Sequence, residues 1–306
     1  MDSQTIYHQV STHYSAASKG TTTEYGSAVA KSFGYSEDEL AKAPEGSNLG
    51  LSCGNPLAIA SISQGETVID LGSGAGFDSF LASNRVGQSG KVIGVDMNKD
   101  MLARANKIKE ETGKTNVEFV ESGITNMSVL QSGIADCIIS NCVINLVPAA
   151  EKHLVFGEMF RLLKSGGRLA ISDILARKAM PEKLRSDMAM YVGCISGASV
   201  VSEYEKFLKD AGFIEIFITD TKSDLNVYLQ TNEDGLKKVD GCIQANLGTG
   251  EQEKGCQPSS DICCAPKPSP PCCATNCCSS ESDYVSLTES DLNKWAGSFK
   301  VYAVKN

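Results

Sequence analysis

The sequence lacks the features that would direct it to a membrane, to secretion or to nucleic acid. No apolar run is long enough to cross a bilayer, and residues 1–5 lack the basic and then apolar pattern of a signal peptide. The net charge is −9, without the clustered Lys and Arg that phosphate backbones require. We therefore expect a cytoplasmic protein that binds neither membranes nor nucleic acid.

Histidine is also scarce, whereas cysteine is abundant. Of the three histidines, only His153 falls within regularly patterned sequence, so no general base is evident. The cysteines number twelve, and in a cytosolic protein metal binding or catalysis is favoured over structural disulfides. Seven of them crowd between Cys256 and Cys278, among Pro and Ser. The dispersed ones are Cys53, Cys137, Cys142, Cys194 and Cys242.

Strand and helix patterns alternate from Thr67 onwards. The predicted strands are Thr67–Leu71, Lys91–Val95, Val117–Val120, Ile134–Ser140, Arg168–Ser172 and Phe213–Thr219. The predicted helices are 36–43, 77–84, Lys99–Glu111, Glu151–Leu163, Pro181–Tyr191 and Val201–Ala211. This alternation predicts an α/β fold with a parallel sheet covered on both faces. Ser298–Val304 alternates like a strand, and we expect it to return antiparallel at the sheet edge.

A glycine loop follows the first predicted strand and predicts a ligand site. It contains Gly72, Gly74 and Gly76, and Asp96 ends the next strand about 20 residues further on. Glycines let the backbone approach a ligand closely, and the acid can accept hydrogen bonds from ribose hydroxyls. A nicotinamide site, with Gly-x-Gly-x-x-Gly, and a turn that binds nothing are the alternatives. The spacing in this chain resembles motif I of class I methyltransferases.

That resemblance implies a Rossmann-like class I methyltransferase fold, with a mostly parallel seven-stranded sheet, and S-adenosyl-L-methionine as cofactor. It implies that Asp70 orders the glycine loop near the methionine moiety and that Asp96 binds the ribose. Met97 then packs against adenine, in a pocket that Gly123 and Ile124 line. The other residues assigned to the cofactor are Tyr25, Gly26 and Asn141.

Three dispersed cysteines flank the edge of the sheet where an acceptor should bind. Cys142 follows the fourth strand, Cys194 follows the fifth, and Cys53 precedes the first. A single cysteine is more often a small buried hydrophobe, which is how we interpret Cys137. Three converging thiolates, however, suit trivalent arsenic, which is soft and keeps a lone pair. That lone pair can attack a sulfonium methyl group without a general base.

The sequence around these cysteines resembles that of arsenite methyltransferases, over Tyr25 to Thr219. The matching segments are Ser52–Pro56, Asn141–Pro148 and Gly193–Gly197. The resemblance implies As(III) bound by Cys142 and Cys194 as the minimal pair, with Cys53 as third ligand or as partner in a transient disulfide. It also implies arsenite and methylated trivalent arsenicals as substrates.

The family's redox chemistry comes with the same resemblance. Each methyl transfer oxidises arsenic, cysteine thiols supply the reducing electrons, and a thioredoxin or glutathione system restores them. Many family members carry a further cysteine after the Tyr-Gly that corresponds to Tyr25 and Gly26, but no cysteine precedes Cys53 in this chain. We expect a monomer.

The sequence divides into four segments. These are an N-terminal segment, 1–57, that carries part of the acceptor site; the methyltransferase core with the arsenic-site loops, 58–230; a linker with a disordered cysteine-rich insertion, 231–283; and a C-terminal helix and strand, 284–306. Adjacent cysteine pairs within the insertion lack the spacing of structural zinc sites. The insertion is therefore either a thiol reservoir or a segment with no catalytic role.

Two other functions compete with arsenite methylation. One is methylation of an organic acceptor, such as a quinone or sterol precursor, with incidental cysteines. The other is metal sequestration by a thiol-rich protein on a degenerate methyltransferase scaffold, which the intact loop from Gly72 to Gly76 and Asp96 disfavour.

Overall fold

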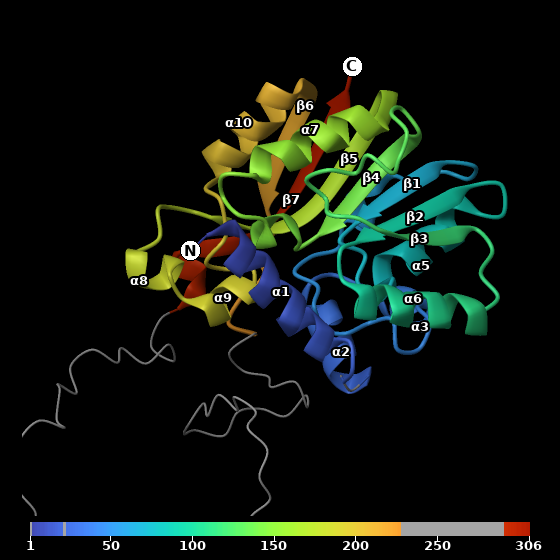
Figure 1. Ribbon diagram of the computed structural model, residues 1–306, viewed down its shortest axis with the longest axis horizontal. Coiled ribbons are helices and arrows are strands. Elements are labelled where there is room, and N and C mark those ends of the chain that lie inside the picture. Colours follow the sequence, from blue (N-terminus) through green and yellow to red (C-terminus); the bar gives the residue numbers. More distant parts are fainter. Residues whose placement is uncertain (1, 21–22, 228–290) are drawn as a thin grey trace, which may run out of the picture. The chain divides into compact units, whose positions relative to one another are not determined.

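The computed structural model describes residues 2–20, 23–227 and 291–306 (Figure 1). The predicted linker with the cysteine-rich insertion, 231–283, and the start of the predicted C-terminal helix near Leu287 lie outside these residues. The chain divides into two units, Met1–Lys238 with Asp291–Asn306, and Val239–Ser290. Everything described below belongs to the first. Within it, no helix has the length and apolar character needed to span a membrane.

The strands and helices follow one another in the order expected for an α/β fold. The strands are β1 (Thr67–Leu71), β2 (Lys91–Asp96), β3 (Val117–Glu121), β4 (Ala135–Asn141), β5 (Leu163–Ala176), β6 (Phe213–Asp220) and β7 (Ala296–Lys305). The helices are α1 (Ser3–Ala17), α2 (Thr23–Ser32), α3 (Glu37–Lys42), α4 (Leu57–Ala60), α5 (Phe77–Val86), α6 (Lys99–Glu111), α7 (Lys152–Leu162), α8 (Glu182–Arg185), α9 (Met188–Val192) and α10 (Val201–Ala211). Short 3₁₀ turns are η1 (Ile144–Leu146) and η3 (Leu292–Lys294).

The seven strands form one sheet in the order β3-β2-β1-β4-β5-β7-β6. Neighbours among β1 to β5 are parallel, and β7 is antiparallel to both β5 and β6. The antiparallel seventh strand is thus confirmed, and it lies one place in from the edge, with β6 outermost. Phe299, Val301 and Ala303 alternate along β7 and are buried in the core on one face of the sheet.

Helices cover both faces of the sheet, as predicted (Figure 1). On one face Phe156 and Met159 of α7, with Tyr204 and Leu208 of α10, join a core that reaches β1 and β5. On the other face Phe80 and other residues of α5 pack with α4 and β1. Because ligands collect at the carboxyl ends of parallel strands, this arrangement leaves that edge free for a site.

Two predicted elements differ in extent. β5 begins at Leu163, five residues before the predicted Arg168, and continues to Ala176 because all nine residues from Arg168 pair with β7. The single helix predicted over Pro181–Tyr191 is instead two short helices, α8 and α9, because the chain turns between them at Ser186 and Asp187.

The N-terminal segment contains two helices that the sequence analysis did not predict, α1 and α2. Asp2 caps α1 by accepting a hydrogen bond from the Thr5 amide. Helix α1 passes the carboxyl ends of the strands and contacts α6, α9 and η1 (Figure 1). The N-terminal segment therefore forms part of the wall above the sheet.

Candidate functional site

The loop after β1 is held in a conformation that requires glycine. The amides of Gly72 and Ser73 both donate to the Val95 carbonyl, which folds the loop over β2. Gly72, Gly74 and Gly76 all have positive φ. A Cβ on Gly72 would lie 2.4 Å from Cγ2 of Val143, so no side chain fits there.

Asp96 lies at the end of β2 beside this loop. Its Oδ2 accepts from the Gly74 amide at 2.8 Å, and its Oδ1 accepts from the Asn98 amide at 2.8 Å. Burial raises the pKa of this carboxyl, while the backbone N–H groups oppose the rise. Each oxygen keeps a lone pair that can accept from a vicinal diol.

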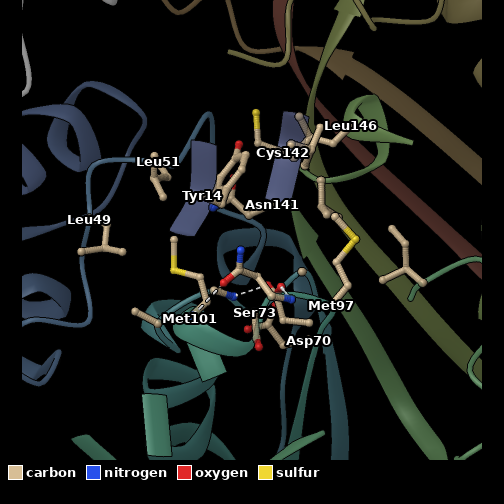
Figure 2. A pocket seen from close by; sticks show the side chains of 18 of the residues that line it. Tyr14, Leu49, Leu51, Asp70, Ser73, Met97, Met101, Asn141, Cys142 and Leu146 are labelled. Carbon is tan, nitrogen blue, oxygen red and sulfur yellow. Dashed lines mark hydrogen bonds between the residues drawn. The ribbon is translucent and has the colours of Figure 1, made fainter. Parts of the chain in front are cut away.

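A cavity of about 370 Å³ opens between the glycine loop and α1 (Figure 2). Asp70, Ser73 and Met101 are at one end of it and Cys142 at the other, with Asn141 between them. Its size is within the range typical of small-molecule sites. The predicted residues that line it are Asp70, Gly72, Gly74, Asp96, Met97, Gly123, Ile124, Asn141 and Cys142.

Five predicted residues do not line the cavity, namely Tyr25, Gly26, Gly76, Cys53 and Cys194. Gly76 instead begins α5, where a Cβ would press on Phe119 and Phe80. Tyr25 and Gly26 pack against the loop of Asn48–Gly50. The packing is so close that a Cβ on Gly50 would lie 2.5 Å from the Tyr25 ring. Asn48 and Leu49 of that loop do line the cavity.

The cavity fits S-adenosyl-L-methionine. A Cβ on Gly123 would meet nothing within 4 Å, and one on Gly74 only the Met101 sulfur at 3.9 Å. Both glycines line the cavity, so their bare backbone leaves room for a ligand. Asp96 has carboxylate oxygens that can accept hydrogen bonds from ribose hydroxyls, and Leu49, Met97 and Met101 supply apolar walls.

A buried polar cluster lies under the middle of the cavity. The Asn141 amide donates to Asp78 Oδ2, the Tyr35 hydroxyl and the Gly54 carbonyl, each at 2.9 Å. The Tyr35 hydroxyl donates to Asp78 Oδ1 at 2.6 Å. Burial raises the pKa of Asp78 to about 6, against hydrogen bonds from Tyr35 and Asn141. Asn141 Oδ1 accepts from the Cys53 amide at 3.2 Å, which ties the cysteine segment to this cluster.

The three predicted acceptor cysteines come together at the carboxyl ends of β4 and β5. Cys53 and Cys142 form a disulfide with their Cα atoms 5.8 Å apart. The Cys194 thiol donates to the Cys142 carbonyl at 2.8 Å. Cys142 and Cys194 have φ of 59° and 64°. This left-handed backbone conformation is unusual for residues other than glycine and asparagine. Such backbone strain is typical of functional sites.

The environment of Cys194 keeps its thiol protonated. Burial raises the pKa of this thiol, and the nearby Asp173 carboxylate raises it further. The Tyr14 hydroxyl lies 3.9 Å from Cys194 Sγ and opposes the shift. Cys137, by contrast, is buried in the core behind β4, as predicted, and its pKa is raised to about 12 by burial.

A second buried cluster, absent from the sequence analysis, holds the cysteine loops against each other. The Asn145 amide donates to the Cys194 carbonyl at 3.1 Å, to Asp173 Oδ1 at 2.9 Å and to the Ile174 carbonyl. Lys152 Nζ donates to the Gly197 carbonyl. Burial lowers the pKa of Lys152 to about 8 and raises that of Asp173 to about 7, each opposed by the charge of the other.

Residues of α1 complete the site and were also missed. Tyr7, Val10, Ser11 and Tyr14 line the cavity. The Tyr14 hydroxyl donates to the Val192 carbonyl at 3.3 Å, and Asn98 Nδ2 donates to the Ser11 carbonyl at 2.9 Å. Helix α1 is thus attached to both the cofactor end and the cysteine end of the cavity.

Comparison with known proteins finds similarity in the same region of the chain. Residues 62–212 match a family model described as a methyltransferase domain. The arsenite methyltransferase of Halobacterium salinarum is 43% identical over 180 residues, which cover 59% of this chain and 45% of that protein. The arsenite methyltransferase of Homo sapiens is 36% identical over 154 residues, covering 48% of this chain and 40% of that protein. The chain thus spans less than half the length of these two relatives.

A solved structure supports the fold. The arsenic (III) S-adenosylmethionine methyltransferase of Chlamydomonas reinhardtii superposes with a TM-score of 0.53 at 21% identity, over 92% of this chain and 73% of that one. The sheet order, the glycine loop and the acid after β2 are those of the class I S-adenosylmethionine-dependent methyltransferase fold. Both of the curated relatives named above are arsenite methyltransferases, and the similarity covers 59% and 48% of this chain.

Proposed function

We propose that the protein methylates trivalent arsenic with S-adenosyl-L-methionine as methyl donor. One observation carries this proposal: Cys142 is bonded to Cys53 and accepts a hydrogen bond from Cys194, at the end of the cavity opposite the cofactor residues. Three thiols at the carboxyl edge of a methyltransferase sheet suit a soft, three-coordinate acceptor. The names of the relatives agree with this chemistry.

Reduction of the disulfide must come first, because Cys53 and Cys142 have no free thiols while they are joined. Arsenite, As(OH)₃, then exchanges each hydroxide for a thiolate. The proton of each thiol leaves with that hydroxide as water, so no separate base is needed. This matters for Cys194, whose raised pKa keeps its proton in place until the acceptor arrives.

The bound cofactor supplies an electrophilic methyl group, and the chain supplies its orientation. Asp96 and the Gly74 backbone fix the ribose end, and Asp70, which accepts from Ser79 Oγ at 2.6 Å, supports the glycine loop beside the methionine end. Cys142 holds arsenic at the far end of the same cavity, with its lone pair available. Positioning of the two reactants is the main contribution of the protein. Tyr25 and Gly26 act indirectly, by shaping the loop of Leu49.

Transfer of a methyl cation oxidises arsenic by two electrons. Two arsenic-bound thiolates that join as a disulfide give up two electrons to arsenic, which returns it to the trivalent state. No proton is released at this step, because the thiol protons have already left as water. Cys53 and Cys142 are one such pair. A thioredoxin or glutathione system is the proposed reductant for this disulfide. We further propose that the protein acts as a cytoplasmic monomer.

The test is methyl transfer from labelled S-adenosyl-L-methionine to As(III) with thiol present. Cys142→Ser and Cys194→Ser should each abolish methylated arsenic, while Cys137→Ser, which changes a core thiol, should leave turnover within about twofold. Cofactor binding should survive in all three variants. A wild-type protein that binds cofactor but never methylates arsenic would contradict the proposal and favour an organic acceptor.

A further inference from the structure

Asp173 has no part in the proposed arsenic chemistry, yet it lies beside two of the thiols. It is in β5, fully buried. One ligand atom each from Cys53, Cys142 and Asp173 lie within 4.8 Å of one another. Among the residues that the structure describes, these three are the His, Cys, Asp or Glu side chains that lie close enough together to share a metal ion. Cys194 is not part of this group.

The carboxylate is oriented but not saturated. Oδ1 accepts from Asn145 Nδ2 and from the Ile174 amide, each at 2.9 Å. Among the described residues, Oδ2 accepts one long hydrogen bond, from the Tyr204 hydroxyl at 3.4 Å. A carboxylate oxygen has two lone pairs, so Oδ2 can still coordinate an ion.

We propose that, after reduction of the disulfide, Cys53, Cys142 and Asp173 bind a divalent thiophilic cation of the zinc class. Zinc binds thiolates at about 2.3 Å and carboxylates at about 2.1 Å, in a tetrahedron. Ligand atoms on one such ion lie about 3.5–3.8 Å apart, which side-chain rotation can reach from the present arrangement. Cys142 lines the cavity, so a water molecule there supplies the fourth ligand.

The zinc complex and the arsenic complex differ in net charge. As(III) with three thiolates is neutral and takes Cys194 as its third donor. Zinc with two thiolates and a carboxylate carries a net charge of −1, and the two thiol protons leave to solvent. The buried Lys152 ammonium interacts with Asp173 and offsets that charge. The two ions therefore compete for Cys53 and Cys142, and they differ in the third donor. The zinc site shares two thiols with the proposed arsenic site but does not depend on methylation.

Zinc affinity of the reduced full-length chain tests the proposal. To remove the other thiols that would compete for zinc, the background variant carries Ser at Cys242, Cys256, Cys263, Cys264, Cys272, Cys273, Cys277 and Cys278. Titration against a chromophoric chelator should show one zinc per chain in this background. Asp173→Asn should weaken binding by about tenfold or more, and Cys142→Ser should abolish it.

Cys194→Ser is the matched control, because it removes the neighbouring thiol but should change zinc affinity by less than about twofold. Loss of zinc in Cys194→Ser with retention in Asp173→Asn would overturn the proposal, as would absence of zinc binding in the background. Zinc-edge X-ray absorption of the background protein needs no Asp173 variant. It should show two sulfur donors, and three would also overturn the proposal. A chain that binds zinc in this way but never methylates arsenic would contradict the proposed function alone.

Discussion

At the scale of single residues, two glycines of the cofactor loop differ in what a side chain would meet. Gly72→Ala places a Cβ 2.4 Å from Val143, whereas Gly74→Ala meets only the Met101 sulfur at 3.9 Å. Both positions have positive φ, which costs a side chain about 1–2 kcal/mol. Overpacking adds about 1–3 kcal/mol at Gly72 alone. Urea denaturation should therefore show Gly72→Ala to be the less stable variant by that margin.

Gly123→Ala is the control for this comparison. It lies in the same cavity, without positive φ and with nothing within 4 Å of a built Cβ. Its unfolding free energy should match that of the wild type, although cofactor affinity should fall because the methyl group intrudes on the cavity. Equal stability of Gly72→Ala and Gly123→Ala would refute the steric account of the loop.

The buried carboxyl of Asp78 predicts a pH-dependent stability. Burial raises its pKa from 3.8 to about 6, and the Glu39 charge adds to the rise while that of Arg85 opposes it. The folded state therefore keeps this proton to a higher pH than the unfolded state does. The stability that results is fully present below about pH 4 and is lost as pH rises to about 6, on the order of 3 kcal/mol.

Asp78→Asn should remove this part of the slope. Its unfolding free energy should fall less than that of the wild type between about pH 4 and about pH 6. Its absolute stability should also be lower, because the new amide cannot accept both hydrogen bonds from Tyr35 and Asn141. The exposed Asp100→Asn serves as control and should keep the wild-type slope. An unchanged slope in Asp78→Asn would assign the titration to other groups.

The sequence predicted residues whose role depends on local pattern and missed those whose role depends on distant partners. The glycine loop and Asp96 are marked by their position after strands. Tyr35 and Asp78 are 43 residues apart, and Asn145 reaches Cys194 across 49. No spacing rule links such pairs, because only the packing of the whole domain brings them together.

At the scale of elements, α1 shows what the sequence analysis overlooked. Ile6 and Val10 are its buried residues, and Tyr14 continues the same four-residue spacing toward the cavity. This row is a helical signal. The polar residues around it hid the pattern. Strands β1, β2 and β4, by contrast, were predictable because strands buried on both faces are nearly continuous apolar runs.

The attachment of α1 to the cofactor side predicts a separable effect at Asn98. This residue is the N-cap of α6, and its Oδ1 accepts from the amides of Asp100 and Met101. Its Nδ2 donates to the Ser11 carbonyl on α1. Asn98→Ser keeps a capping oxygen but is too short to reach Ser11, whereas Asn98→Ala loses both interactions.

We expect Asn98→Ser to retain wild-type stability within about 0.5 kcal/mol and Asn98→Ala to lose about 1 kcal/mol. Both should bind S-adenosyl-L-methionine more weakly, because α1 forms one wall of the cavity. Calorimetric titration and denaturation of the two variants separate the contributions. Wild-type cofactor affinity in Asn98→Ser would mean that α1 is held without this hydrogen bond.

At the scale of the whole molecule, distant parts of the chain are needed to form the acceptor site. Cys53 comes from the N-terminal segment, Cys142 from the turn after β4 and Cys194 from the loop before α10. The C-terminal strand β7 also contributes, since Ser298 Oγ donates to the Cys53 carbonyl at 2.6 Å. The chain must therefore return through residues 291–306 before the site is complete.

This topology predicts that residues 230–288 can be removed while residues 291–306 cannot. Asn226 Nδ2 donates to Asp291 Oδ1 at 3.0 Å, and the Leu292 amide donates to Asn226 Oδ1 at 3.1 Å. The two ends of the removed stretch are thus adjacent, and a short Gly-Ser linker can join them. The joined protein should keep its melting temperature and cofactor affinity. A chain truncated after residue 290 should not fold, because β5 and β6 both lose their partner strand.

The joined protein also distinguishes the two interpretations of the cysteine-rich stretch. If those thiols donate electrons, arsenic methylation by the joined protein should be normal in a single turnover and slower over many turnovers when reductant is limiting. Multiple-turnover rates equal to those of the intact chain at every reductant concentration would leave the stretch without a catalytic role. A joined protein that fails to fold would instead contradict the adjacency of Asn226 and Asp291 on which the experiment rests.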